Sequence, residues 1–204
     1  MKILVTGFEP FGGESRNPSA EVVKLLPDVI GGAEIIKLTL PVVRFRCVRA
    51  VEQAVDAHCP DVVLSIGQAG GRAAVCVERV AVNLDDYRIP DNEGNQPVEE
   101  PVVSRGPDAY LCTLPVRQMV AAMQQGGIPA AESLSAGTYV CNHLLYSVSH
   151  LLAARCPEAK AGFIHIPFLP DQVADKPNVP SMSLALSARA VELAIKVIAE
   201  EKAR

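Results

Sequence analysis

Short apolar runs alternate with longer segments of helical periodicity along most of the chain. Several runs are apolar at consecutive positions, which is typical of strands buried on both faces of a sheet. We expect strands over 2–8, 34–42, 61–69, 76–84, 133–140 and 161–168. We expect helices over 18–26, 43–57, 115–125, 141–155 and 182–202. This alternation predicts an α/β fold, a three-layer α/β/α sandwich with a mostly parallel, mixed central sheet.

Length and composition narrow the class of protein. The 204 residues are expected to form a single domain over 1–204, and a hydrophobic content of 49% argues against disorder. A net charge of −4 lacks the basic footprint of a nucleic-acid binder. No apolar run reaches the roughly 18 residues of a membrane helix, and the run Ile3 to Val5 is too short for a signal peptide. We therefore expect a cytoplasmic protein.

Six cysteines are present, and no two of them form a Cys-x-x-Cys pair. Free thiols are the expected state of a cytoplasmic chain with a sizeable core, and neither a structural zinc site nor another metal site is predicted. Cys59 and Cys156 occupy matching helix-to-strand joints, "AHCPDVVL" and "ARCPEAKAGFI", in which proline ends the helix. These two cysteines are expected to be structural.

Two long polar segments interrupt the alternation of predicted strands and helices. Residues 85–108 are rich in proline and glycine, and "LPDQVADKPNVPSM" (169–182) follows the last predicted strand. Loops of this length inside a compact domain are usually functional or disordered. Each of them follows a predicted strand that carries an unexpected polar residue, so we expect both loops to be functional.

Three residues could form a thiol-hydrolase triad. Cys141 is predicted at a strand-to-helix turn, where the helix dipole would stabilise a thiolate, and His165 lies within the last predicted strand. Glu78 could fix the tautomer of the imidazole. Each also has a structural interpretation: Cys141 as a buried thiol, His165 as a core histidine and Glu78 as a solvated residue of an edge strand. Spacing alone leaves both interpretations open.

Glycine-rich stretches suggest a different function. "TGFEPFGG" follows the first predicted strand, and "IGQAGGR" ends on an arginine after the third. Such loops could hold an anion in a phosphate- or nucleoside-binding α/β protein. However, neither stretch matches a dinucleotide-binding or P-loop motif.

Long segments of the chain resemble the pyroglutamyl peptidase I family, also called pyrrolidone-carboxylate peptidases. The resemblance is carried in order by "TGFEPFGG", "GQAGGR", "ERVAVNLDDYRIPDNEGNQP", "AGTYVCNHLLY" and "GFIHIPFLP". It implies a cysteine peptidase that removes an N-terminal pyroglutamyl residue from peptides, with no metal and no cofactor. The family's catalytic triad falls on Glu78, Cys141 and His165. Members are typically cytosolic and often tetrameric, so a homo-oligomer is expected.

The resemblance also implies a substrate pocket. The pyroglutamate ring is expected between aromatic side chains of the first loop, with further contacts from the third predicted strand and from the residues before the nucleophile. Where this chain has a tyrosine at position 139, the family usually has phenylalanine, and that hydroxyl would need a partner in a closed pocket. The implied pocket residues are Phe8, Phe11, Gln68, Tyr139 and Val140, with Arg88 carried over weakly.

Overall fold

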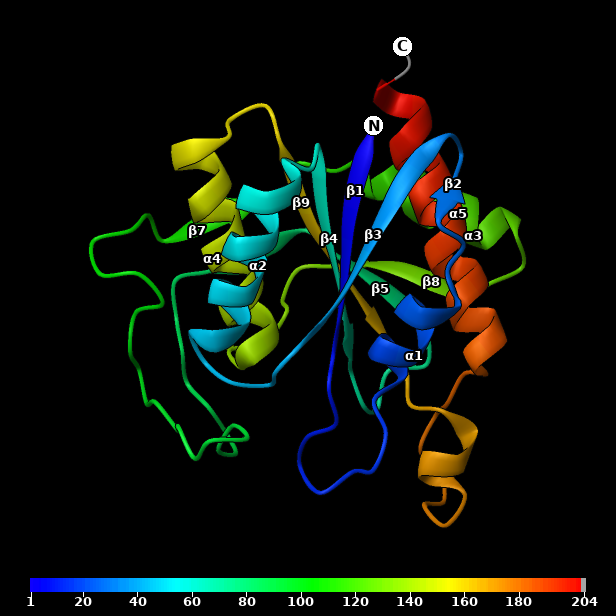
Figure 1. Ribbon diagram of the computed structural model, residues 1–204. Coiled ribbons are helices and arrows are strands. Elements are labelled where there is room, and N and C mark those ends of the chain that lie inside the picture. The colour runs from blue at the N-terminus through cyan, green and yellow to red at the C-terminus, as the bar shows by residue number, and fades with distance from the viewer. Residues whose placement is uncertain (203–204) are drawn as a thin grey trace.

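A seven-stranded sheet runs through the centre of the computed structural model, which describes residues 1–202 (Figure 1). Its strand order is β2-β3-β1-β4-β9-β5-β8. Strands β2, β5 and β8 run against the direction of the other four. The strands are β1 (Lys2–Phe8), β2 (Val29–Ile30), β3 (Ala33–Leu40), β4 (Val62–Gln68), β5 (Val75–Glu78), β8 (Ala130–Ser133) and β9 (Lys160–Ile166). The predicted mostly parallel, mixed sheet is confirmed.

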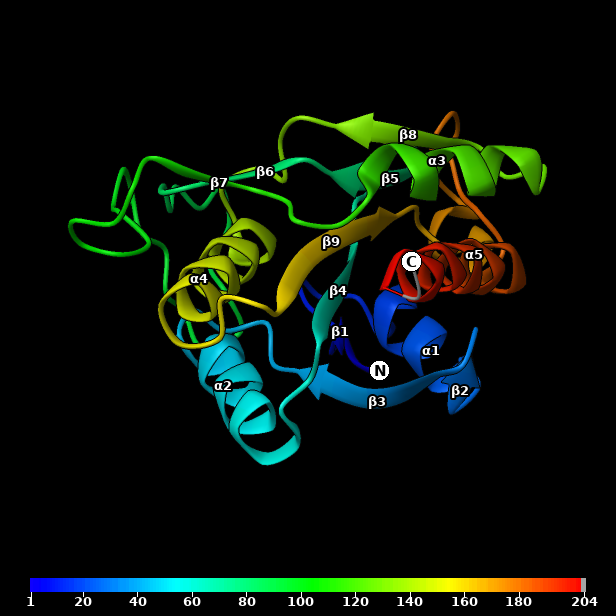
Figure 2. The same ribbon diagram turned by 90° about the horizontal axis from the view of Figure 1, so that it is seen from above.

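Helices cover both faces of this sheet, as Figure 2 shows from above. One layer consists of α1 (Pro18–Leu25), α3 (Val116–Gln125) and α5 (Leu184–Lys202), and the other of α2 (Arg46–His58) and α4 (Val140–Arg155). Each layer encloses its own cluster of buried apolar side chains against the sheet. The three-layer α/β/α prediction is therefore confirmed, and the central strands are apolar on both faces because both faces are covered.

The strand expected over 76–84 is two strands that belong to different sheets. β5 ends at Glu78, and β6 (Val80–Val82) pairs with β7 (Ala109–Leu111) in a separate two-stranded sheet. The switch occurs at Arg79, whose backbone N–H donates to Ser133 while its carbonyl accepts from Cys112. Apolar residues stand on both sides of Glu78 and Arg79 in the sequence, so the hydrophobic pattern does not reveal the change of partner.

The strand expected over 133–140 is also wrong. β8 ends at Ser133, and the following residues form a loop that leads directly into α4. In this loop the Gly137 backbone N–H donates to the Ser135 hydroxyl, and Gly137 has a φ of 78°, in the left-handed region that glycine adopts without steric cost. Cys141 therefore follows a loop and not a strand.

Both long loops are ordered by local contacts. The first is closed by a bridge between Asp85 and Glu100, and the second contains the short 3₁₀ helix η1 (Pro170–Val173). None of the helices within residues 1–202 is long and apolar enough to cross a membrane.

Candidate active site

Cys141 and His165 both lie near Gly67 at the carboxyl end of the central strands. His165 on β9 is paired in register with Gly67 on β4, and its side chain is 4% exposed. A Cβ atom at Gly67 would lie 2.9 Å from Cys141 Sγ and 2.8 Å from the ring of Phe163. The missing side chain at Gly67 therefore makes room for the thiol, directly beside the strand position of His165.

Glu78 reaches His165 from the neighbouring antiparallel strand. β5 pairs with β9 so that Cys76 lies opposite His165, and alternation puts Glu78 on the same face of the sheet. His165 Nδ1 lies 2.7 Å from Glu78 Oε1, and both side chains are buried. Because Nδ1–H donates to the carboxylate, the neutral ring carries its free lone pair on Nε2.

Arg72 is a third member of this network. From the sequence, it was expected to be able to help bind an anionic ligand. One of its guanidinium nitrogens donates to Glu78 Oε1 at 2.7 Å, and the other donates to the Ser135 carbonyl at 3.0 Å. Burial raises the pKa of Glu78, but hydrogen bonds from His165, Ser133 and Arg72 outweigh this and hold the pKa below its usual value. The arginine of "GQAGGR" is thus occupied by an internal carboxylate.

Burial sets the protonation states of the thiol and the imidazole. It raises the pKa of Cys141 to about 12; the charge of Glu78 acts in the same direction and Arg72 acts against it. Burial also lowers the pKa of His165, although Glu78 opposes that shift. These shifts favour a protonated thiol and a neutral ring, whereas the start of α4 favours the expected thiolate. No hydrogen bond among residues 1–202 joins Cys141 to His165 in this state.

The two residues after Cys141 anchor the first turn of α4. The buried side chain of Asn142 accepts a hydrogen bond from Val82 N at 3.0 Å and donates to the carbonyls of Val82 and Leu84. His143 Nδ1 lies 2.7 Å from a carboxylate oxygen of Asp85. These contacts connect the turn that holds Cys141 to β6 and to the first long loop. These contacts could not be predicted from the sequence, because they depend on β6 lying outside the central sheet.

A small cavity of about 40 Å³ opens beside the thiol. It is lined by Phe8, Phe11, Asn17, Val42, Gln68, Tyr139, Val140 and Cys141. The structure thus brings together the five pocket residues that the resemblance implied most directly. Asn17 and Val42 were missed, although the side chain of Asn17 caps α1 through the Ser19 N–H and therefore has a clear structural role as well.

Tyr139 and Arg88 have different positions relative to this cavity. The Tyr139 hydroxyl donates to the Pro90 carbonyl at 3.1 Å, which supplies the partner that a tyrosine needs there. Its ring lies 6.0 Å from that of Phe11 and 4.8 Å from that of Tyr87, measured between centroids. Arg88 is exposed on the first long loop and does not line the cavity, so its role stays a prediction.

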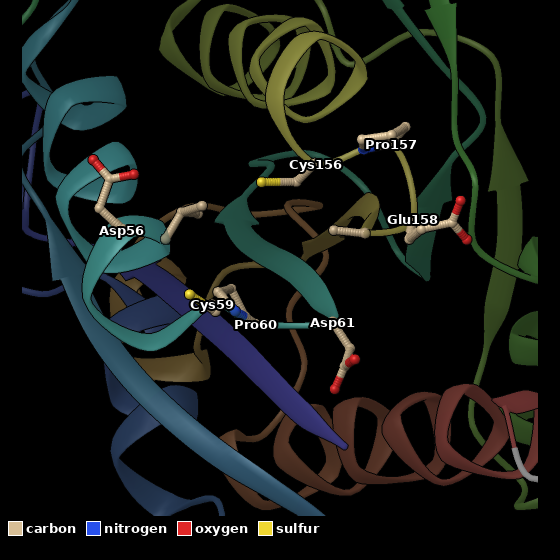
Figure 3. Close-up of a pocket in the computed structure, with 9 residues that line it drawn as sticks. Asp56, Cys59, Pro60, Asp61, Cys156, Pro157 and Glu158 are labelled. Atoms are coloured by element: carbon tan, nitrogen blue, oxygen red, sulfur yellow. The ribbon is translucent and has the colours of Figure 1, made fainter.

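A larger cavity of about 360 Å³ lies at the opposite, amino ends of β4 and β9 (Figure 3). Cys59 and Cys156 both line it, together with the prolines that follow them. They occupy the C-cap positions of α2 and α4, in agreement with the predicted joints, although Cys59 is exposed. The residues that line this cavity include no histidine.

Metal ligands do not gather at either cavity. Within residues 1–202, no group of three or more histidine, cysteine, aspartate or glutamate side chains is arranged to hold a metal ion.

Comparisons with known proteins agree with this geometry. A family model described as pyroglutamyl peptidase matches residues 1–201. Pyrrolidone-carboxylate peptidases of Treponema denticola and Levilactobacillus brevis are 55% and 54% identical, covering 98% and 97% of this chain and 94% and 97% of their own. The crystal structure of pyroglutamyl peptidase I from Bacillus amyloliquefaciens superimposes with a TM-score of 0.95 at 44% identity, covering 98% of this chain and 97% of its own. This chain belongs to the pyroglutamyl peptidase family.

Proposed function

We propose that this protein removes N-terminal pyroglutamyl residues from peptides, with Cys141 as nucleophile, His165 as general base and acid, and Glu78 as the group that orients His165. The main support for this proposal is the arrangement of side chains at one end of the sheet. His165 lies 2.7 Å from Glu78, and the Cys141 thiol lies over Gly67 and beside the cavity. Family membership and the names of the close relatives support the same activity.

The resting protonation states suggest how the first step proceeds. The neutral thiol transfers its proton to His165 Nε2 as Sγ attacks the pyroglutamyl carbonyl carbon, so no free thiolate is needed beforehand. The developing oxyanion would be met by the unpaired backbone N–H groups in the first turn of α4. His165 then protonates the departing amine, and a thioester remains on Cys141.

The second step returns the enzyme to its starting state. Neutral His165 takes a proton from water as the water oxygen attacks the thioester carbonyl carbon. The carbon–sulfur bond breaks, pyroglutamate leaves, and the proton on His165 returns to the thiol. Glu78 stabilises each imidazolium form through its contact with Nδ1, and Arg72 holds the carboxylate in place.

The cellular and quaternary setting belongs to the same proposal. We infer a single domain over residues 1–204 in the cytoplasm, and a homo-oligomer, tetrameric by resemblance to the family. Light scattering coupled to size-exclusion chromatography measures the subunit number. Its outcome is independent of the catalytic assignment.

A direct assay tests the activity. The purified protein should release the chromophore from a pyroglutamyl amide, and should do so without an added metal or cofactor. Prior treatment with a thiol-alkylating reagent should stop the release, with the label found on Cys141. If the chromophore is not released, the proposed function is wrong.

Gly67→Ala should strongly reduce turnover although it adds only one methyl group. The new Cβ would meet Cys141 Sγ at 2.9 Å, closer than nonbonded contacts allow, so the thiol or the strand must shift. A misplacement of about 1 Å at a reacting group can cost roughly 10²-fold, and we expect a loss of that order in kcat/KM on the pyroglutamyl amide.

Gly162→Ala is the matched control for Gly67→Ala. It crowds β9 near its other end, where the Cβ would meet Leu114 at 2.4 Å. It should lower the melting temperature while the folded fraction keeps kcat/KM within about threefold of the parent, since the effects of distant sites are independent. Parental kcat/KM in Gly67→Ala would contradict the placement of the thiol.

Arg72→Gln should move the acidic limb of the kcat/KM profile to higher pH. His165 accepts a proton only when its ring is neutral, so activity falls as the pH drops through the pKa of His165. Burial is the main cause that lowers this pKa, and the positive charge of Arg72 lowers it further. Removing that charge raises the pKa, and the ring then becomes protonated at a higher pH.

Arg79→Gln controls for the loss of an arginine near the same strand. The guanidinium of Arg79 pairs with Glu132 at 2.7 Å and forms no ion pair with the side chain of Glu78 within residues 1–202. Its pH profile should superimpose on that of the parent. Identical acidic limbs for the parent and Arg72→Gln would show that Arg72 does not act on His165.

A further inference from the structure

The second long loop contributes a buried amide next to the cavity. Gln172 lies on η1, and only 8% of its surface is exposed. Its side chain contacts Gln68, which lines the cavity at the end of β4. The catalytic mechanism uses no group of this loop, so the contact between the two glutamines requires its own explanation.

Two backbone groups fix the orientation of the Gln172 amide. Leu169 N–H donates to Gln172 Oε1 at 2.9 Å, so the oxygen must face that donor. Gln172 Nε2 lies on the other side, where it donates to Gln68 Oε1 at 2.9 Å and faces the Arg16 carbonyl at 3.5 Å. A flipped Gln172 would set donor against donor at Leu169 and acceptor against acceptor at Arg16. The observed orientation is therefore the one the backbone requires.

The orientation of Gln68 follows from that of Gln172. Its Oε1 is the atom that accepts from Gln172, so a flip of Gln68 would place two NH₂ groups against each other. The Gln68 Nε2 group consequently has no acceptor within residues 1–202, and its hydrogens are available to a ligand in the cavity. Gln68 thus presents a donor, and not an acceptor, to whatever binds there.

We propose that Gln172 is a specificity-determining positioning residue, which locks Gln68 as the hydrogen-bond donor to the ring carbonyl of a five-membered lactam. This inference rests on the proposed function for the identity of the ligand. A lactam carbonyl is a strong acceptor, whereas the ring N–H would oppose the Gln68 NH₂ group. A prearranged donor gives affinity without the entropic cost of ordering it at binding.

Gln172→Glu should reverse the lock. One carboxylate oxygen can still accept from Leu169 N–H, and the other can only accept from Gln68, whose NH₂ group would turn toward it. Gln68 Oε1 would then face the ring carbonyl, acceptor against acceptor. Gln172→Met removes both polar atoms and leaves Gln68 free to adopt either orientation. Asp171→Asn, which alters only the exposed ion pair with Arg16 in the same turn, is the matched control.

Equilibrium binding of 2-pyrrolidinone and pyrrolidine-2-thione, followed by NMR titration, tests the lock without any scissile bond. Sulfur is a weak acceptor, so the parent and Asp171→Asn should bind the lactam about tenfold more tightly than the thiolactam. In Gln172→Glu that ratio should fall to about one, with lactam affinity reduced roughly 10- to 100-fold because the ring carbonyl is left unpaired. Gln172→Met should fall between them, with a loss of about 3- to 10-fold.

Turnover and binding measurements test the role of Gln172 and the proposed function separately. On the pyroglutamyl amide, Gln172→Glu should raise KM while kcat changes little, which a disturbed catalytic centre would not produce. An unchanged lactam-to-thiolactam ratio in Gln172→Glu, or no lactam binding by the folded parent, would overturn the role of Gln172. A parent that binds the lactam with the expected ratio but hydrolyses no pyroglutamyl amide would instead contradict the proposed function alone.

Discussion

Replacing Cys141 with alanine should abolish turnover and leave the fold intact. The proposed nucleophile lines the cavity and lies over Gly67, and alanine is well tolerated in the first turn of a helix such as α4. Loss of the nucleophile in a catalytic triad commonly costs about 10⁴-fold or more in kcat. We expect a drop of that order on the pyroglutamyl amide, with an unchanged circular dichroism spectrum.

Cys141→Ser should be almost as inactive. The thiol already has a pKa of about 12, and its proton must move to a neutral imidazole during attack. A serine hydroxyl is far less acidic than a thiol, so the same transfer becomes much harder. Cys59→Ser and Cys156→Ser change the second cavity and should leave turnover near that of the parent. Parental turnover in Cys141→Ala would refute the assignment.

The sequence was sufficient to locate the catalytic candidates but not their connections. Cys141 and His165 could be placed because ligands bind at the carboxyl ends of strands in open α/β sheets. The contact between His165 and Glu78 required the antiparallel pairing of β5 with β9, which no hydrophobic pattern specifies. Arg72 was missed for the same reason: its carboxylate partner lies on a strand whose neighbour and direction were unknown.

Burial opposes the thiolate expected at Cys141 more strongly than the helix dipole favours it. A helix N-terminus stabilises a negative charge by about 0.3–1 kcal/mol, which corresponds to less than one pKa unit. Burial can shift the pKa of an ionisable group by up to about 3–5 units. The position of Cys141 at the start of α4 was predicted from the sequence, but the packing of its thiol against Gly67 is visible only in the folded chain.

The last strand and the loop after it differ in how much of their structure could be predicted from the sequence. β9 was predicted to within two residues at each end because its apolar run is short and bounded, whereas η1 follows it without a periodic pattern. The loop was expected to be functional from its length and position alone. The residue that contacts the cavity wall, Gln172, could not be singled out, because its partner Gln68 lies 104 positions away in the sequence.

Pyroglutamyl amides should be hydrolysed at least about 10⁴-fold more efficiently than matched glutaminyl amides. A pyroglutamyl terminus is a neutral lactam, whereas a glutaminyl terminus brings an ammonium group into the cavity. The residues that line the cavity include no carboxylate to pair with it, and Glu78 is already bound to His165 and Arg72. Sites that leave a polar group unpaired discriminate by about 10⁴- to 10⁵-fold, which is the basis of our estimate.

Phe11→Ala and a control variant test the predicted preference for pyroglutamyl amides. Phe11→Ala removes an apolar wall that contacts Tyr139, and should lower kcat/KM for the pyroglutamyl amide by about 10- to 100-fold. It should not rescue the glutaminyl amide, because no counter-charge is gained. Leu134→Ala, at a side chain that is 72% exposed and outside the cavity, should change neither rate. A ratio of kcat/KM near unity between the two amides would refute the lactam pocket even if Cys141 proved to be the nucleophile.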